Sequence, residues 1–104
     1  SLGAKGTVVI TRRGYMADFV TNCHPQKSRI YAFTNDSQTR RRLVMNRNVS
    51  PYRIAFSQDP EKTLTAAFKL LKSKAGLETG DKVVVISDML SGQGIEAIQV
   101  RRLP

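Results

Sequence analysis

The chain has 104 residues, 40% of them hydrophobic and 24% charged, a composition typical of one soluble globular domain. No apolar run approaches the roughly 20 residues of a membrane-spanning helix, and residues 1–6 lack the apolar core of a signal peptide. We expect a single domain over residues 1–104, with 1–6 as a domain boundary or a remnant of cloning. One cysteine and one histidine exclude an internal disulfide and a zinc-ligand spacing, and they favour a cytoplasmic location.

The charge is strongly basic, since 17 Lys and Arg residues against 8 Asp and Glu leave a net charge of +9. Such a surface attracts anions in general, including nucleotides, sugar phosphates, RNA and acidic partners. The charge alone does not select among them.

The first third of the chain predicts a strand, a helix and a second strand. Residues 7–11 are a β-branched run, typical of a strand buried on both faces. After a turn at residues 12–14, apolar side chains recur at helical spacing and Pro25 ends the helix. These side chains are Met16, Phe19, Val20 and Cys23. Residues 29–34 form the second strand.

The next segment predicts a basic helix. Asn35 is expected to open it, with Gln38 as the last member of a capping box. The helix is expected to bury Leu43 and Val44 and to end near Asn48.

A short third strand over residues 52–56 precedes the clearest helix of the sequence. Asp59 is expected to cap that helix, with Pro60 at its first position and Gly76 just past its end. The predicted buried stripe comprises Leu64, Ala67, Phe68, Leu71 and Ala75.

The last part predicts two strands joined by a short loop. Residues 82–87 read as a second fully buried strand, and residues 96–102 alternate apolar and polar side chains, as a half-exposed edge strand does. The connection over 88–94 is too short for a crossover, so the last strand should be antiparallel. The order βαβαβαββ places helices on both faces of a mainly parallel sheet, an α/β fold.

Two loops at the carboxyl ends of strands are candidate anion-binding segments, because helix N-termini also point to that edge. The first comprises Thr11, Arg12, Arg13, Gly14 and Tyr15, and the second comprises Ser91, Gly92, Gln93 and Gly94. Hydroxyl, guanidinium and glycine amide groups together suit a phosphate. The alternative is that both segments are only tight turns.

Other reactive side chains predict no catalytic or metal site. Cys23 closes an apolar helix stripe, His24 falls in a turn, and Asp88 suits a turn cap. Arg40, Arg41 and Arg42 span most of a helix turn, so they cannot share one face. They favour a solvated face or a contact with another domain over nucleic-acid binding, since no aromatic-interleaved RNA motif is present.

Taken together, the motifs closely resemble the C-terminal domain of pyruvate kinase over nearly the whole chain. They are Val9-Ile10-Thr11-x-x-Gly14-x-x-Ala17, Tyr31-Ala32-Phe33-Thr34 followed by Thr39, Val49-x-Pro51, Gly80-Asp81-x-Val83-Val84-Val85-Ile86-Ser87 and Gly92-x-Gly94. The resemblance implies a three-layer α/β/α domain with a mixed five-stranded sheet of order 3-2-1-4-5 and an antiparallel fifth strand.

The resemblance also implies a function. Such a domain is non-catalytic, binds a phosphorylated effector in many members, and helps to form a homo-oligomer through its edge strand and helices. Its partners would be the catalytic domains of a pyruvate kinase, which use Mg and K ions with ADP or ATP. No cofactor, metal or membrane is expected for this chain, and it should not transfer phosphate by itself.

The family's effector loops are matched in part. Thr11 and Gly14 match the first loop, where Arg13 and Met16 replace hydroxyl residues. Gly92 and Gly94 match the second loop, where Glu96 and Ala97 replace Thr-Asn. A free-standing sensor of sugar phosphates or nucleotides and a basic nucleic-acid-binding module are the alternative functions.

Overall fold

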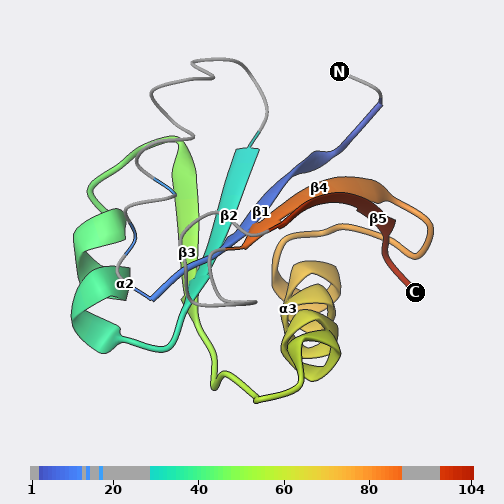
Figure 1. The fold of residues 1–104 in the computed structure, drawn as a ribbon. Helices are drawn as coiled ribbons and strands as arrows, with labels where there is room; N and C mark the ends of the chain where they lie inside the picture. Colours follow the sequence, from blue (N-terminus) through green and yellow to red (C-terminus); the bar gives the residue numbers. More distant parts are fainter. Residues whose placement is uncertain (1–2, 13, 15–16, 18–28, 88–96) are drawn as a thin grey trace.

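The computed structural model describes residues 3–12, 14, 17, 29–87 and 97–104. Its strands are β1 (Gly6–Ile10), β2 (Arg29–Thr34), β3 (Val49–Arg53), β4 (Lys82–Ser87) and β5 (Ala97–Arg102). They form one sheet of order β3-β2-β1-β4-β5, in which only the β4–β5 pairing is antiparallel. Figure 1 shows this twisted sheet with helix α2 (Ser37–Leu43) and helix α3 (Pro60–Lys74) beside it. The predicted fold class, strand order and antiparallel last strand are confirmed.

Two hydrophobic cores, one on each face of the sheet, give the molecule its layers. The core under α3 joins alternate residues of β1 and β4, such as Val8 and Val85, to Phe68 and Leu71 of the helix. The other core joins the remaining strand positions to Leu43 of α2; its members are Val9, Ala17, Ile30, Ala32, Leu43 and Val49. Because neighbouring strand residues point to opposite faces, β1 is buried on both sides.

Helix α3 forms where its local signals predict it. The Asp59 carboxylate accepts a hydrogen bond from the Glu61 amide at 3.0 Å, and Pro60 occupies the first turn. Leu64, Ala67, Phe68 and Leu71 are buried as predicted, whereas Ala75 is the half-buried C-cap. Gly76 follows at φ 78°, a left-handed conformation that stops the helix.

Helix α2 is shorter and starts later than predicted. Asp36, not Asn35, is the N-cap, because its carboxylate accepts hydrogen bonds from the amide and hydroxyl of Thr39 at 3.0 and 2.7 Å. The helix ends at Leu43 and not near Asn48, and Val44, predicted to be buried, is 55% exposed. Of the two apolar residues predicted to be buried, Leu43 joins the core and Val44 does not. The apolar pattern therefore does not continue past the end of the helix at Leu43.

The prediction for β3 was wrong by three residues, since the strand covers Val49–Arg53 and not 52–56. Register decides this: Val49 pairs with Ile30 and Arg53 with Thr34, so β3 runs alongside residues 30–34 of β2. Pro51 is tolerated because β3 is an edge strand. Ile54 and Phe56 instead pack from a loop against the core under α3.

Strand β4 has the predicted bounds, but its burial differs from the prediction. Buried and half-buried residues alternate along it, so it is not fully buried on both faces. Strand β5 covers Ala97–Arg102, and the predicted first residue, Glu96, lies outside the described residues. The predicted helix of Met16, Phe19, Val20 and Cys23 lies outside the described residues, apart from the helical backbone at Ala17.

Candidate functional site at the carboxyl edge of the sheet

The segment after β1 is held in place by hydrogen bonds to β2 and within itself. The Thr11 amide donates to the Phe33 carbonyl at 2.9 Å, and the Thr34 hydroxyl donates to the Arg12 carbonyl at 2.9 Å. The Thr11 side chain is 1% exposed, and its hydroxyl accepts a hydrogen bond from the Gly14 amide at 3.1 Å. Thr11 therefore shapes the turn, while Arg12 remains exposed at its surface.

Gly14 is the residue that lets this turn pack against α2. Its φ is 82°, and a Cβ atom there would lie 2.5 Å from Arg42 Nη2 and 3.1 Å from Thr39 Cγ2. The left-handed backbone favours glycine, and a side chain here would also force Thr39 and the end of the Arg42 side chain to move. The predicted glycine thus has a structural explanation, independent of any ligand.

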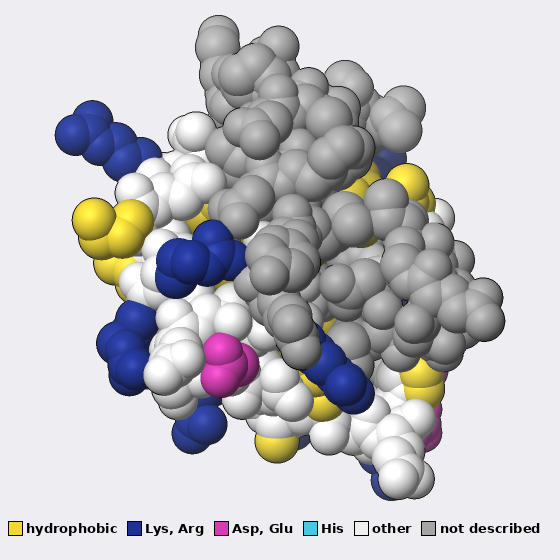
Figure 2. Space-filling view, turned by 60° about the vertical axis from the view of Figure 1, so that its left-hand side comes forward, with side chains coloured by type: hydrophobic (Ala, Val, Ile, Leu, Met, Phe, Trp, Pro, Cys, Tyr) yellow, Lys and Arg dark blue, Asp and Glu magenta, His cyan; other side chains and the backbone are white. Residues whose placement is uncertain are grey.

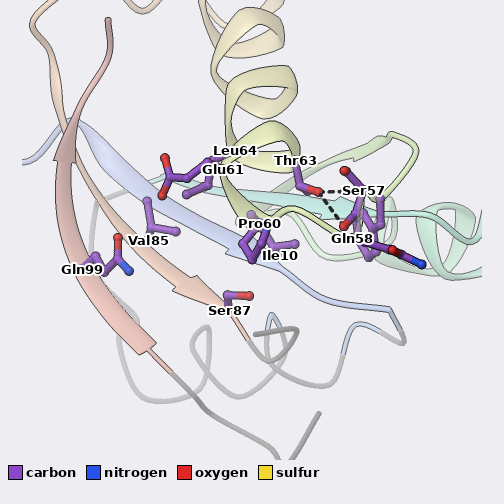
Figure 3. Close-up of a pocket in the computed structure, with 11 residues that line it drawn as sticks. Ile10, Ser57, Gln58, Pro60, Glu61, Thr63, Leu64, Val85, Ser87 and Gln99 are labelled. Atoms are coloured by element: carbon purple, nitrogen blue, oxygen red, sulfur yellow. Dashed lines mark hydrogen bonds between the residues drawn. The ribbon is translucent and has the colours of Figure 1, made fainter. Parts of the chain in front are cut away.

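A cavity of about 310 Å³ opens at the same edge, between the ends of β1 and β4 and the start of α3 (Figure 3). It is lined by Ile10, Phe56, Ser57, Gln58, Pro60, Glu61, Thr63, Leu64, Val85, Ser87 and Gln99. In the sheet, β1 lies between β2, which is the next strand along the chain, and β4. This is the topological switch point, where open α/β sheets bind ligands.

The cavity lining combines apolar side chains, such as Ile10 and Leu64, with neutral polar side chains, such as Ser57 and Gln99. The Ser57 amide donates to the Thr63 hydroxyl at 2.9 Å, which fixes the loop that precedes α3. The charged lining residue, Glu61, is paired with Arg101 of β5, whose guanidinium donates to both carboxylate oxygens at 2.9 and 3.1 Å. The hydrogen bond from Arg101 lowers the pKa of Glu61. Among the described lining residues, a ligand could therefore form hydrogen bonds with uncharged polar side chains and with Glu61, whose charge is balanced by Arg101.

The structure describes only part of the predicted anion-binding segments. Thr11, Arg12 and Gly14 are described, whereas Arg13, Tyr15, Ser91, Gly92, Gln93 and Gly94 lie outside the described residues. Ile10 and Ser87 are register partners, so the two loops leave neighbouring strands as expected. The residues with other assigned roles that also lie outside are Met16, Cys23, His24, Asp88 and Glu96.

Sequence reasoning missed the cavity itself. Its lining draws on the loop before α3, and on Gln99 from the antiparallel strand, none of which carries a recognisable motif. The Asp-Pro helix start was the available signal, because it places the first turn of α3 at the carboxyl edge. Within the described ranges, no three His, Cys, Asp or Glu side chains are grouped to hold a metal ion, and no described helix is long and apolar enough to cross a membrane.

The fold and the site at its switch point define a class of small α/β domain. The pyruvate kinase alpha/beta domain family matches residues 1–100, and the chain belongs to that family. The resemblance seen in the sequence motifs is therefore confirmed.

Particular relatives agree with this assignment. The chain is 36% identical over 104 residues to pyruvate kinase isozyme A, chloroplastic, of Ricinus communis, covering all of this chain and 17% of that protein. It is 38% identical over 96 residues to the isozyme A of Nicotiana tabacum, covering 92% of this chain and 15% of that protein. A structure of Cryptosporidium parvum pyruvate kinase in complex with ADP shares the fold, with TM-score 0.81 and 24% identity over 97% of this chain and 20% of the other. The chain thus spans about one-sixth of the length of these two chloroplastic relatives.

Proposed function

We propose that the chain is a regulatory and assembly domain of a pyruvate kinase. Phosphoryl transfer from phosphoenolpyruvate to ADP, with its Mg and K ions, would take place in other domains of that enzyme. The family assignment and the small share of each relative that the chain covers support this proposal. The observation that carries the regulatory part is the cavity at the switch point between β1 and β4.

The ligand of this site is proposed to be a phosphorylated metabolite. The cavity accommodates its apolar and hydroxyl-bearing part, because the described walls are apolar with neutral hydrogen-bonding groups. The phosphate would bind to the two loops that leave β1 and β4, where Arg12 and Arg13 offer charge-assisted hydrogen bonds.

Calorimetry of the 104-residue chain against sugar phosphates and nucleoside phosphates tests the site. The double variant Arg12→Ala with Arg13→Ala should weaken binding about tenfold or more, whereas Lys62→Ala with Lys69→Ala removes the same charge from exposed positions on α3 and should not. Binding that is unaffected by the first variant would exclude this phosphate site. Turnover of phosphoenolpyruvate and ADP by the chain alone would overturn the non-catalytic assignment.

We further propose a plastid location in place of the cytoplasmic one expected from cysteine content. The support is that the relatives from Ricinus communis and Nicotiana tabacum are described as chloroplastic. Cell fractionation with an antibody against the chain tests this, and recovery in the cytosolic fraction would contradict it.

The assembly surface is proposed to be the face of β4 and β5 that lies opposite α3. Ile98 pairs with Ile86 and Val100 with Val84, so four aliphatic side chains form a strip on this face. Ile98 is 66% exposed and Val100 53% exposed, although both are apolar. A strip of this kind at a sheet edge suits a contact with another copy of the domain.

A further inference from the structure

A second hollow lies along the side of the sheet that is formed by the outermost strand, β3, where α2 and α3 approach this strand. This edge groove has a volume of about 510 Å³. It is lined by Ser37, Arg40, Arg41, Pro51, Tyr52, Arg53, Leu70 and Lys74. Figure 1 shows β3 at the sheet edge near α2, and Figure 2 turns this side of the molecule forward.

The edge groove concentrates positive charge from three separate elements. Arg40 and Arg41 come from α2, Arg53 from the end of β3, and Lys74 from the last turn of α3. Figure 2 shows Lys and Arg side chains spread over the exposed part of this side, with Asp and Glu side chains sparse among them. The groove therefore has four formal positive charges at its walls.

These charges are not neutralised by the surrounding described residues. Arg40, Arg53 and Lys74 form no ion pair with a described carboxylate. Arg41 contributes to lowering the pKa of Asp36, but the larger causes there are the hydrogen bonds from Thr39, which engage that carboxylate in the helix cap. Cations held near one another in this way favour an anionic ligand.

The edge of β3 is shaped against the pairing of another strand. Pro51 in the middle of the strand has no amide hydrogen to donate, and the exposed Arg53 follows at its end. An extended acidic peptide added to the sheet is therefore a poor occupant. A compact ligand that reaches the side chains and not the strand backbone fits better.

An aromatic side chain, Tyr52, lines the groove together with the basic side chains. The Tyr52 ring stacks on the buried Phe33 ring, with centroids 5.3 Å apart and planes inclined by 20°. This stacking holds the half-buried Tyr52 in position, and Leu70 of α3 lines the groove beside it. The hydroxyl groups of Ser37 and Tyr52 add neutral hydrogen-bonding groups.

We propose that the edge groove binds a compact molecule that carries two or more phosphate groups. Each phosphate monoester bears about −1.5 to −2 charges at neutral pH, so two of them balance the four cations. Guanidinium groups bind phosphate oxygens in pairs, which suits the three arginines. A volume of about 510 Å³ is in the range of small-molecule sites.

The groove is separate from the proposed effector site and does not depend on it. Arg42, the neighbour of Arg40 and Arg41, lies instead over Gly14, on the side of α2 that packs on the loop after β1. The three arginines of α2 thus divide between two surfaces: Arg40 and Arg41 line the groove and Arg42 lies at Gly14, as their helical spacing predicts.

The test uses inorganic triphosphate as the probe and NMR spectroscopy of the chain at low salt. We expect saturable shifts at the amides of Ser37, Tyr52, Arg53 and Lys74, and weaker binding of orthophosphate. Arg40→Ala with Lys74→Ala should weaken triphosphate binding at these amides about tenfold or more. The control Arg47→Ala with Lys62→Ala also removes one arginine and one lysine, both exposed and outside the groove, and should change the affinity less than about twofold.

Three outcomes would overturn the proposal. One is the absence of saturable shifts at the groove, and another is an equal loss in both double variants, which would show that only net charge acts. The third is tighter binding of a single-stranded RNA at the groove, which would assign it to a macromolecule. Shifts confined to Thr11, Arg12 and Gly14 are a case of the first outcome and would support the effector site instead. Because all four substituted side chains are exposed, matching thermal melts should confirm that the variants fold.

Discussion

Gly14 and Gly76 share a left-handed backbone but differ in what surrounds them. A Cβ atom at Gly14 would meet Thr39 and Leu43 at 3.1 and 3.3 Å, whereas nothing lies within 4 Å of one at Gly76. We predict that Gly76→Ala destabilises the fold by about 1 kcal/mol through backbone strain alone. Gly14→Ala should cost more, because the neighbours must also move.

Chemical denaturation of the two variants checks this difference, with Gly76→Ala as the control for backbone strain. Equal losses would show that the loop after β1 moves away from α2 at little cost. In that case the packing of Gly14 would not hold the loop.

The ion pair between Glu61 and Arg101 makes stability depend on pH. Its hydrogen bond lowers the pKa of Glu61 below the ordinary value of 4.5, so the folded state binds the proton less readily than the unfolded state. The stabilisation is complete well above pH 4.5 and is lost as pH falls through the lower folded pKa. We predict that the melting temperature of the protein exceeds that of Glu61→Gln at pH 7 and that this difference shrinks toward pH 3.

Thermal melts from pH 7 to pH 3 measure this effect. Since Glu61 is on the surface, the difference should be small and should decrease with added salt. A difference that stays constant over the whole range would show that the carboxylate charge is not what matters.

At the scale of elements, α3 is the helix whose start is set most locally. Asp59→Ala removes the side chain that accepts the Glu61 amide hydrogen bond, and we predict a loss of about 1 kcal/mol in the free energy of unfolding. Asp59→Ser keeps a capping oxygen and should retain most of the stability. Urea denaturation distinguishes them, and equal losses would mean that the cap does not stabilise α3.

The elements differ in how far sequence patterns could predict them. Strands β2 and β4 and helix α3 have the predicted bounds because the β-branched and apolar runs of the strands and the caps of the helix are local signals. The start of α2 depended on which of two adjacent capping residues reaches Thr39, and β3 depended on its register with β2. Neither contact can be predicted from the periodicity of apolar side chains in the sequence.

For the whole molecule, the aliphatic strip on β4 and β5 predicts self-association. We expect the chain to sediment as a dimer or larger species at about 100 µM, a concentration at which weak contacts form. Ile98→Lys with Val100→Lys should return it to a monomer, because like charges would then face each other across the contact.

The matched control is Val44→Lys with Met45→Lys, which places two lysines on exposed apolar positions of the α2 side. This variant should sediment as the unsubstituted chain does. Loss of association in the control alone would move the contact from β5 to α2.

By itself the sequence determined the α/β class, the succession of elements, the antiparallel last strand and, by resemblance, the family. These depend on periodicity, helix caps and connection length, which are properties of short segments. The tertiary structure decided the extent of β3, the cavity beside Glu61 and the groove around Tyr52, because each needs contacts between residues far apart in the chain. The three arginines of α2 illustrate both levels: their spacing separates them, and packing against Gly14 and β3 decides which surface each one joins.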